Sequence, residues 1–113
     1  MKNPSKEKEA IFQENEIATC GVIFTELLGC SKNPKESEKL KTVLECFEYL
    51  SFEKQDWLEV ACLFAKLKKS GLTIPFQDGI IAYLAIKNDC QLWTLDNHFK
   101  LIQTLVPVLK LFD

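Results

Sequence analysis

Apolar and polar positions change along this chain in short segments that predict strands and helices in turn. Apolar residues at helical spacing predict helices over 22–30, from 33 to near 50, around Trp57–Leu67, over 78–88 and over 97–105, and a weak one over 5–15. Short β-type runs predict strands over 16–20, 72–74, 91–95 and 106–112, with a brief strand or turn over 49–52. Short strands alternating with helices favour a parallel sheet covered by helices on both faces.

Two helices have clear start or face signals. Asn33 can cap a helix whose first position is Pro34, and Glu36 completes a capping-box spacing. The next helix has Trp57, Val60, Ala61, Phe64 and Leu67 on one side, and Gly71 stops it. These signals predict an α/β chain of one domain.

Composition fits a single globular domain of 113 residues. The hydrophobic fraction is 47% and the charged fraction 27%, both ordinary values. The net charge of −2 gives no basic footprint for nucleic acid, so binding RNA would need a metal or a partner chain to supply positive charge.

The five cysteines predict reduced thiols of a cytoplasmic protein. Their number is odd, no two are spaced as C-x-x-C, and the single histidine, His98, is far from all of them. Cys30, Cys46 and Cys62 fall in predicted helices, where we expect small buried thiols. No apolar run approaches the length of a membrane span and the N-terminus does not resemble a secretory signal, so we expect no membrane association.

Glu26 is the residue whose position most needs an explanation. On a helical wheel it falls between Val22 and Ile23, on a helix with almost no polar face. A glutamate there is costly to bury or faces a cleft. The alternative is a solvated glutamate on an edge helix.

Two aspartates follow predicted strands. Asp78 opens the apolar helix after Pro75, and Asp96 follows the strand that ends at Leu95. Each alone fits a helix cap or a turn residue. Together with Glu26, however, they lie at strand-to-helix transitions, which gather at one edge of a parallel sheet. Clustered carboxylates need a cation, and Mg²⁺ or Mn²⁺ prefers such oxygen ligands and can activate water for phosphodiester hydrolysis.

Three segments resemble the PIN-domain ribonucleases of the VapC toxin family. Residues 17–28 (IATCGVIFTELL) look like the second strand and helix of that family, with Glu26 as its acid. Residues 71–82 (GLTIPFQDGIIA) are similar to its G-x-x-I-P-x-x-D-x-x-I-A stretch, with Asp78 in the metal position. Residues 92–99 (LWTLDNHF) look like its T-x-D-x-x-F element, which places Asp96 in the site and Thr94 as a support for the carboxylates or a metal-bound water.

The resemblance implies a three-layer α/β/α domain whose body spans 16–112, after a poorly matched segment 1–15. It implies a metal-dependent endoribonuclease with Glu26, Asp78 and Asp96 as metal-binding and catalytic residues. It also implies an RNA substrate, with tRNA among the family's targets, a VapB-type antitoxin as partner, and a homodimer. His98 stands where many relatives carry a second acid.

The sequence departs from the family at its start. The family opens with a buried central strand that ends in an Asp-Thr/Ser-Asn/Ser motif, and nothing before Ile17 resembles it. We therefore expect an N-terminally truncated domain that lacks one metal-binding aspartate: a misassigned start, a fragment or a gene remnant. Two other interpretations stay open: a non-catalytic PIN-like module that binds an antitoxin or another PIN chain, and an unrelated α/β domain whose three acids are caps.

Overall fold

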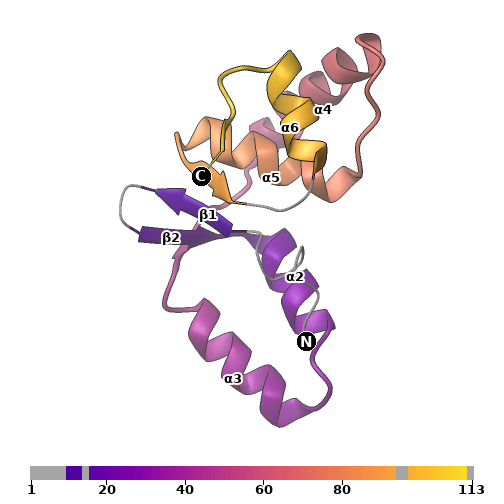
Figure 1. Cartoon of the computed structure of the whole chain (residues 1–113). Coiled ribbons are helices and arrows are strands. Elements are labelled where there is room, and N and C mark those ends of the chain that lie inside the picture. The colour runs from indigo at the N-terminus through magenta and orange to yellow at the C-terminus, as the bar shows by residue number, and fades with distance from the viewer. Residues whose placement is uncertain (1–9, 14–15, 94–96, 112–113) are drawn as a thin grey trace.

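The protein is an α/β domain built on one five-stranded sheet. The computed structural model describes residues 10–13, 16–93 and 97–111 (Figure 1). Its elements, in chain order, are β1 (Ala10–Gln13), β2 (Glu16–Thr19), α2 (Gly21–Gly29), α3 (Pro34–Leu44), β3 (Glu48–Tyr49), α4 (Lys54–Lys69), α5 (Phe76–Lys87), β4 (Gln91–Trp93), α6 (Asn97–Leu105) and β5 (Lys110–Leu111).

The sheet is mixed, with the N-terminal strand at its centre. The strand order is β3-β2-β1-β4-β5. β1 runs antiparallel to both of its neighbours, pairing Ile11 with Ala18 of β2 and with Leu92 of β4. The outer pairs, β2 with β3 and β4 with β5, are parallel. The expectation of a wholly parallel sheet was therefore wrong at its centre.

β1 also corrects the expectation of a weak helix over 5–15 and of an empty central position. Residues 10–13 form a strand, while residues 5–9 and 14–15 of that predicted helix lie outside the described part. β1 lies between β2 and β4, so the facing backbone groups of those two strands are paired. Two residues separate β1 from β2 in the sequence, and such a short connection permits only an antiparallel hairpin.

The helices form two groups around the hairpin of β1 and β2. In Figure 1, α4, α5 and α6 gather on one side of this hairpin, and α2 and α3 extend from the other. α2 packs against α3, and α5 contacts α4, α6 and α2. Helix α5 is thus the element that links the two groups.

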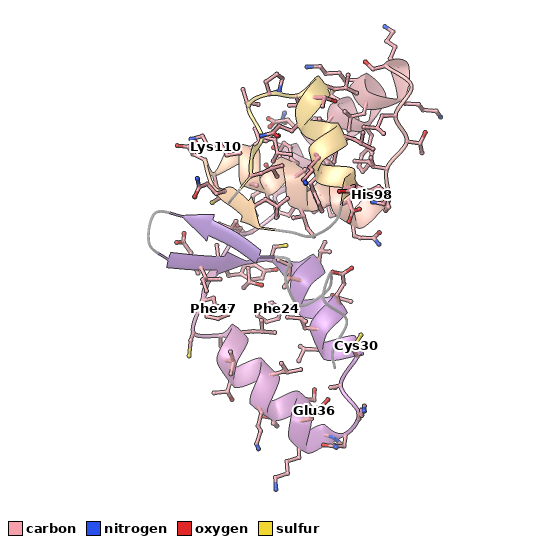
Figure 2. The ribbon with its side chains drawn as sticks, viewed as in Figure 1. Phe24, Cys30, Glu36, Phe47, His98 and Lys110 are labelled. Carbon is pink, nitrogen blue, oxygen red and sulfur yellow. The ribbon has the colours of Figure 1, made fainter. Side chains whose placement is uncertain are left out.

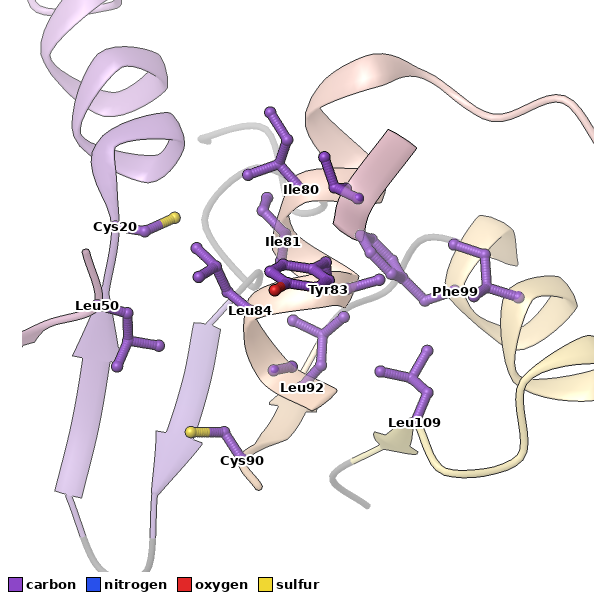
Figure 3. Close-up of a cluster of buried hydrophobic side chains, with 14 of the residues drawn as sticks. Cys20, Leu50, Ile80, Ile81, Tyr83, Leu84, Cys90, Leu92, Phe99 and Leu109 are labelled. Carbon is purple, nitrogen blue, oxygen red and sulfur yellow. The ribbon is translucent and has the colours of Figure 1, made fainter. Parts of the chain in front are cut away.

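The core is centred on α5, because this helix is apolar all round. Its residues from Asp78 to Ala85 are all buried, as expected of a helix enclosed on every side. Figure 3 shows Ile81 and Leu84 of α5 among Leu92 of β4, Phe99 of α6 and Leu109, all close to fully buried. This packing fixes the start of α5, where Asp78 lies.

Three further expectations were wrong in detail. Residues 72–74 precede α5 without forming a strand. The helix that begins at Pro34 ends at Leu44 rather than near Leu50, and the chain turns into β3. Cys30, Cys46 and Cys62 are exposed, whereas Cys20 and Cys90 are buried; none of the five, all within the described part, forms a disulfide.

Candidate functional site

Asp78 is a buried carboxylate in the first turn of α5. The N-cap of this helix is Pro75, which provides no side-chain cap, and α5 begins at Phe76. Asp78 therefore lies two residues inside the helix, where unpaired backbone N–H groups favour negative charge. Its side chain is only 8% exposed. Asp78 is thus a buried acid in the first turn of α5 and is not itself the N-cap residue.

His98 brings the start of α6 against this acid. Its Nδ1 lies 3.1 Å from Oδ2 of Asp78, within hydrogen-bonding distance. Figure 2 shows His98 at the beginning of α6, on the part of that helix nearest α5. The side chain of His98 is 44% exposed, so this pair has one buried and one accessible partner. The contact joins two of the three segments that resemble the PIN family.

Glu26 lies on the wall of a cavity of about 600 Å³. The cavity is bounded by the start of α2, the segment from β3 to α4, and the start of α5. Glu26 is half-buried there. Of the interpretations that its position on the helical wheel allowed, facing a cleft is the one the structure supports.

The predicted carboxylate trio is described only in part. Asp96 and Thr94 lie outside the described residues, so the convergence of Glu26, Asp78 and Asp96 stays a prediction. Within the described ranges, no three His, Cys, Asp or Glu side chains form a group that could hold a metal ion. Glu26, Asp78 and His98 therefore do not by themselves make a three-ligand site.

Thr19 provides a buried polar atom at the carboxyl end of β2. Its side chain is almost fully buried, and its Oγ1 has no hydrogen-bond partner in the part of the chain that the structure describes. A buried hydroxyl without a partner costs about 1–3 kcal/mol. Thr19 lies in the segment that resembles the second strand of the PIN family, just before the cavity residue Cys20.

The sequence was compared with protein-family models and with curated proteins. No protein-family model matches the sequence, and neither does any curated protein. The resemblance to PIN-domain ribonucleases therefore depends on the three sequence motifs alone. Among the described residues, no helix is long and apolar enough to cross a membrane.

A second polar cluster joins α4 to α5 and was not predicted from the sequence. The hydroxyl of Tyr83 lies 2.7 Å from Oδ1 of Asp56 and 2.5 Å from Oε1 of Glu59. Lys87 donates to the same Oδ1 of Asp56. Asp56 also accepts from the backbone N–H of Glu53 at 2.7 Å, closing a capping box at the start of α4.

This cluster shifts the pKa of two groups. Hydrogen bonds from Lys87, from the backbone of Glu53 and from Tyr83 lower the pKa of Asp56 to about 2. Burial, together with the neighbouring carboxylates of Glu59 and Asp56, raises the pKa of Tyr83. Both shifts hold the groups in their ordinary states near neutral pH, so we assign the cluster to stability.

The buried thiols do not supply a nucleophile. Burial raises the pKa of Cys20, which lines the cavity, and also that of Cys90. A thiol with a raised pKa is a poor nucleophile near neutral pH, because the thiolate is the reactive form. We therefore assign no nucleophilic role to Cys20 or Cys90.

Proposed function

We propose that this chain is a PIN-type endoribonuclease dependent on Mg²⁺ or Mn²⁺, similar to the toxins of VapBC pairs, and that it hydrolyses RNA phosphodiesters. The observation that carries the proposal is the 3.1 Å contact between Asp78 and His98. It brings the start of α5 against the start of α6, and Asp96 precedes His98 by two positions in the sequence. Two motifs separated along the chain thus meet in the fold.

The three predicted site residues carry carboxylates, which are suitable ligands for a hard divalent cation. Asp78, Asp96 and Glu26 would supply carboxylate oxygens, the donors that Mg²⁺ and Mn²⁺ prefer. A bound cation would activate water and compensate the charge of the phosphate. Burial at the N-terminus of α5 fixes the carboxylate of Asp78, and the accessible ring of His98 orients it by the hydrogen bond.

The wider features of the proposal follow from the same resemblance. It implies a cytoplasmic protein with a VapB-type antitoxin as inhibitor, a second copy of the chain as partner in a homodimer, and tRNA as one candidate substrate. It also places α2 to α6 in a PIN-like three-layer arrangement. Because the net charge of the chain is −2, a metal ion or a partner chain must supply the positive charge that binds the RNA phosphates.

RNA cleavage with Mn²⁺, with and without a chelator, tests the activity. We expect cleavage that the chelator abolishes and that falls at least about 100-fold in Asp78→Asn, because one metal-binding carboxylate is lost. The matched control is Asp89→Asn, which removes an exposed carboxylate at the opposite end of α5. Equal cleavage by Asp78→Asn and the parent chain would remove our assignment of the site.

One observation favours a second candidate, a non-catalytic PIN-like module that binds an antitoxin or another PIN chain. The central position of the sheet is held by β1, whose sequence Ala-Ile-Phe-Gln carries no acid. The family's first aspartate therefore has no counterpart in this strand. Saturable binding of a synthetic VapB-type peptide, without any metal-dependent cleavage of RNA, would favour this candidate over the nuclease.

A further inference from the structure

The cavity beside Glu26 has the size and lining of a site for a small planar group. Its volume of about 600 Å³ lies within the range of small-molecule sites. Its floor is made by Cys20, Leu50, Ile80 and Leu84, all buried. Figure 3 shows Cys20 pointing from the end of β2 toward α5, with Ile80 and Leu84 on the opposite side.

Aromatic rings at the mouth of the cavity present flat faces that are already held in place. Trp57 and Phe76 are stacked with their planes 11° apart, and Phe76 stacks on Phe64 with planes 4° apart. The ring centroids of Phe52 and Trp57 lie 4.5 Å apart in an edge-to-face arrangement. Trp57 is nevertheless 49% exposed and Phe76 60% exposed. Large aromatic surfaces that are ordered and still accessible suit stacking with a planar ligand.

The charge of the lining selects among planar ligands. Glu26 is an acid on the wall, Gln77 and Thr25 are neutral polar residues, and no Lys, Arg or His lines the cavity as the structure describes it. The lining thus lacks the cationic side chains that would bind an anionic group, whereas its apolar surfaces and neutral polar residues would accommodate an uncharged ring with N–H groups on its edge. A nucleobase has this combination of apolar faces and polar edge.

The cavity also reaches the first turn of α5, which carries the proposed catalytic acid Asp78. Gln77, which lines the cavity, directly precedes Asp78 on α5. A base seated against Trp57 and Phe76 would leave its sugar and phosphate near the start of α5. We propose that the cavity is a subsite for an unpaired base of the RNA substrate, stacked on Phe76 and Trp57. The inference rests on the proposed function for the identity of the polymer.

Nucleoside binding in chelator tests the subsite without requiring catalysis. In a Trp93→Phe chain, Trp57 is the only tryptophan, and its fluorescence is titrated with adenosine, guanosine and ribose 5-phosphate. We expect saturable changes with both nucleosides and none with ribose 5-phosphate. Phe76→Ala should weaken binding by about 5- to 150-fold, the contribution of one base–aromatic stack. The matched control, Leu58→Ala, removes an exposed apolar side chain beside Trp57 that does not line the cavity, and should leave binding unchanged.

The outcomes separate this inference from the nuclease proposal. Nucleoside binding that Phe76→Ala weakens, in a chain that does not cleave RNA, would support the subsite and refute the nuclease. Cleavage with no nucleoside binding would refute the subsite alone. A Trp57 signal that changes with protein concentration, and not with nucleoside, would show that a second copy covers the rings. A Trp57 signal that changes with a VapB-type peptide, and with no nucleoside, would assign the cavity to a protein partner. Either of these last two results would overturn the inference.

Discussion

The hydroxyl of Tyr83 on α5 lies 2.7 Å from Oδ1 of Asp56 on α4. That oxygen also accepts from Lys87 of α5, so it holds two hydrogen bonds that join α4 to α5. The core is centred on α5, and the proposed catalytic acid lies at its start. The stability of this contact therefore bears on the site, although Asp56 is not part of it.

Acid should weaken the attachment of α4 to α5. The pKa of Asp56 is lowered to about 2, so its contribution to stability is complete above its ordinary value near 4 and is lost as pH falls from about 4 toward about 2. We expect the difference in urea midpoint between the parent chain and Asp56→Asn to be constant from about pH 7 to 4 and to shrink below. Asp89→Asn, at an exposed acid paired with Lys110, is the control. A difference that stays constant down to about pH 2 would contradict the assignment.

Gly79 should not tolerate a methyl group while Phe64 is present. A Cβ at Gly79 would lie 2.2 Å from the far end of the Phe64 ring. Gly79→Ala should therefore lower the melting temperature, since overpacking costs about 1–3 kcal/mol and exceeds the gain in helix propensity. In a Phe64→Ala background, the same change should instead stabilise by about 1 kcal/mol. Equal effects in both backgrounds would show that Phe64 does not set the space at Gly79.

Thr19→Val should stabilise the chain by about 1 kcal/mol or more. The change removes a buried hydroxyl that has no partner in the described part of the structure, and keeps the side chain's shape. The control is Thr25→Val, whose hydroxyl donates to the carbonyl of Gly21 at 2.8 Å and should not stabilise. A lower melting temperature for Thr19→Val would indicate that the hydroxyl binds a group beyond the described residues, such as a site water.

Ile11→Pro should disrupt the centre of the sheet. Ile11 has paired strands on both sides, so loss of its N–H leaves a ladder acceptor unpaired at a cost of about 1–3 kcal/mol. Ile11→Val keeps the N–H and the β-branched shape and should cost less than about 1.5 kcal/mol. Urea unfolding measures both variants. Equal stability of the proline and valine variants would place β1 outside the cooperative fold.

Capping residues and apolar spacing, which are read from a few neighbouring residues, predicted helices α3, α4 and α6. Asn33 does accept from the backbone N–H of Glu36 at 2.8 Å, and α3 begins at Pro34 as its cap predicts. The helix over Asn97–Leu105 was also predicted with these bounds. In α4, Val60 and Leu67 are buried as expected, but Trp57 and Ala61 on the same predicted side are exposed. The spacing of apolar residues therefore predicted the helix α4 correctly but only part of the face that it buries.

The features that the sequence pattern did not predict depend on contacts between residues far apart in the sequence. Residues 10–13 become a strand because β2 and β4 provide partners on both sides, and no local signal reports such partners. Residues 72–74 have strand-like composition but join no ladder. In the site, Glu26 was identified from its place on an apolar helix. The aromatic rings at the mouth of the cavity were not predicted, because Trp57 and Phe76 come together only when α4 and α5 pack. The position of Phe76 directly after Pro75 was the one sequence signal that could have suggested an aromatic residue at the start of α5.

The direction of β1 has a consequence for the order in which the sheet can assemble. β1 and β2 are separated by two residues, so they can pair as a hairpin on a microsecond timescale. β4 is separated from β1 in the sequence by α2, α3, α4 and α5, so its pairing with β1 closes a long loop. An all-parallel sheet would have needed a long crossover for every one of its contacts. Among the strand pairings, that of β1 with β2 closes the shortest loop and that of β1 with β4 the longest, so the pairing of β1 with β4 carries the largest entropic cost of loop closure.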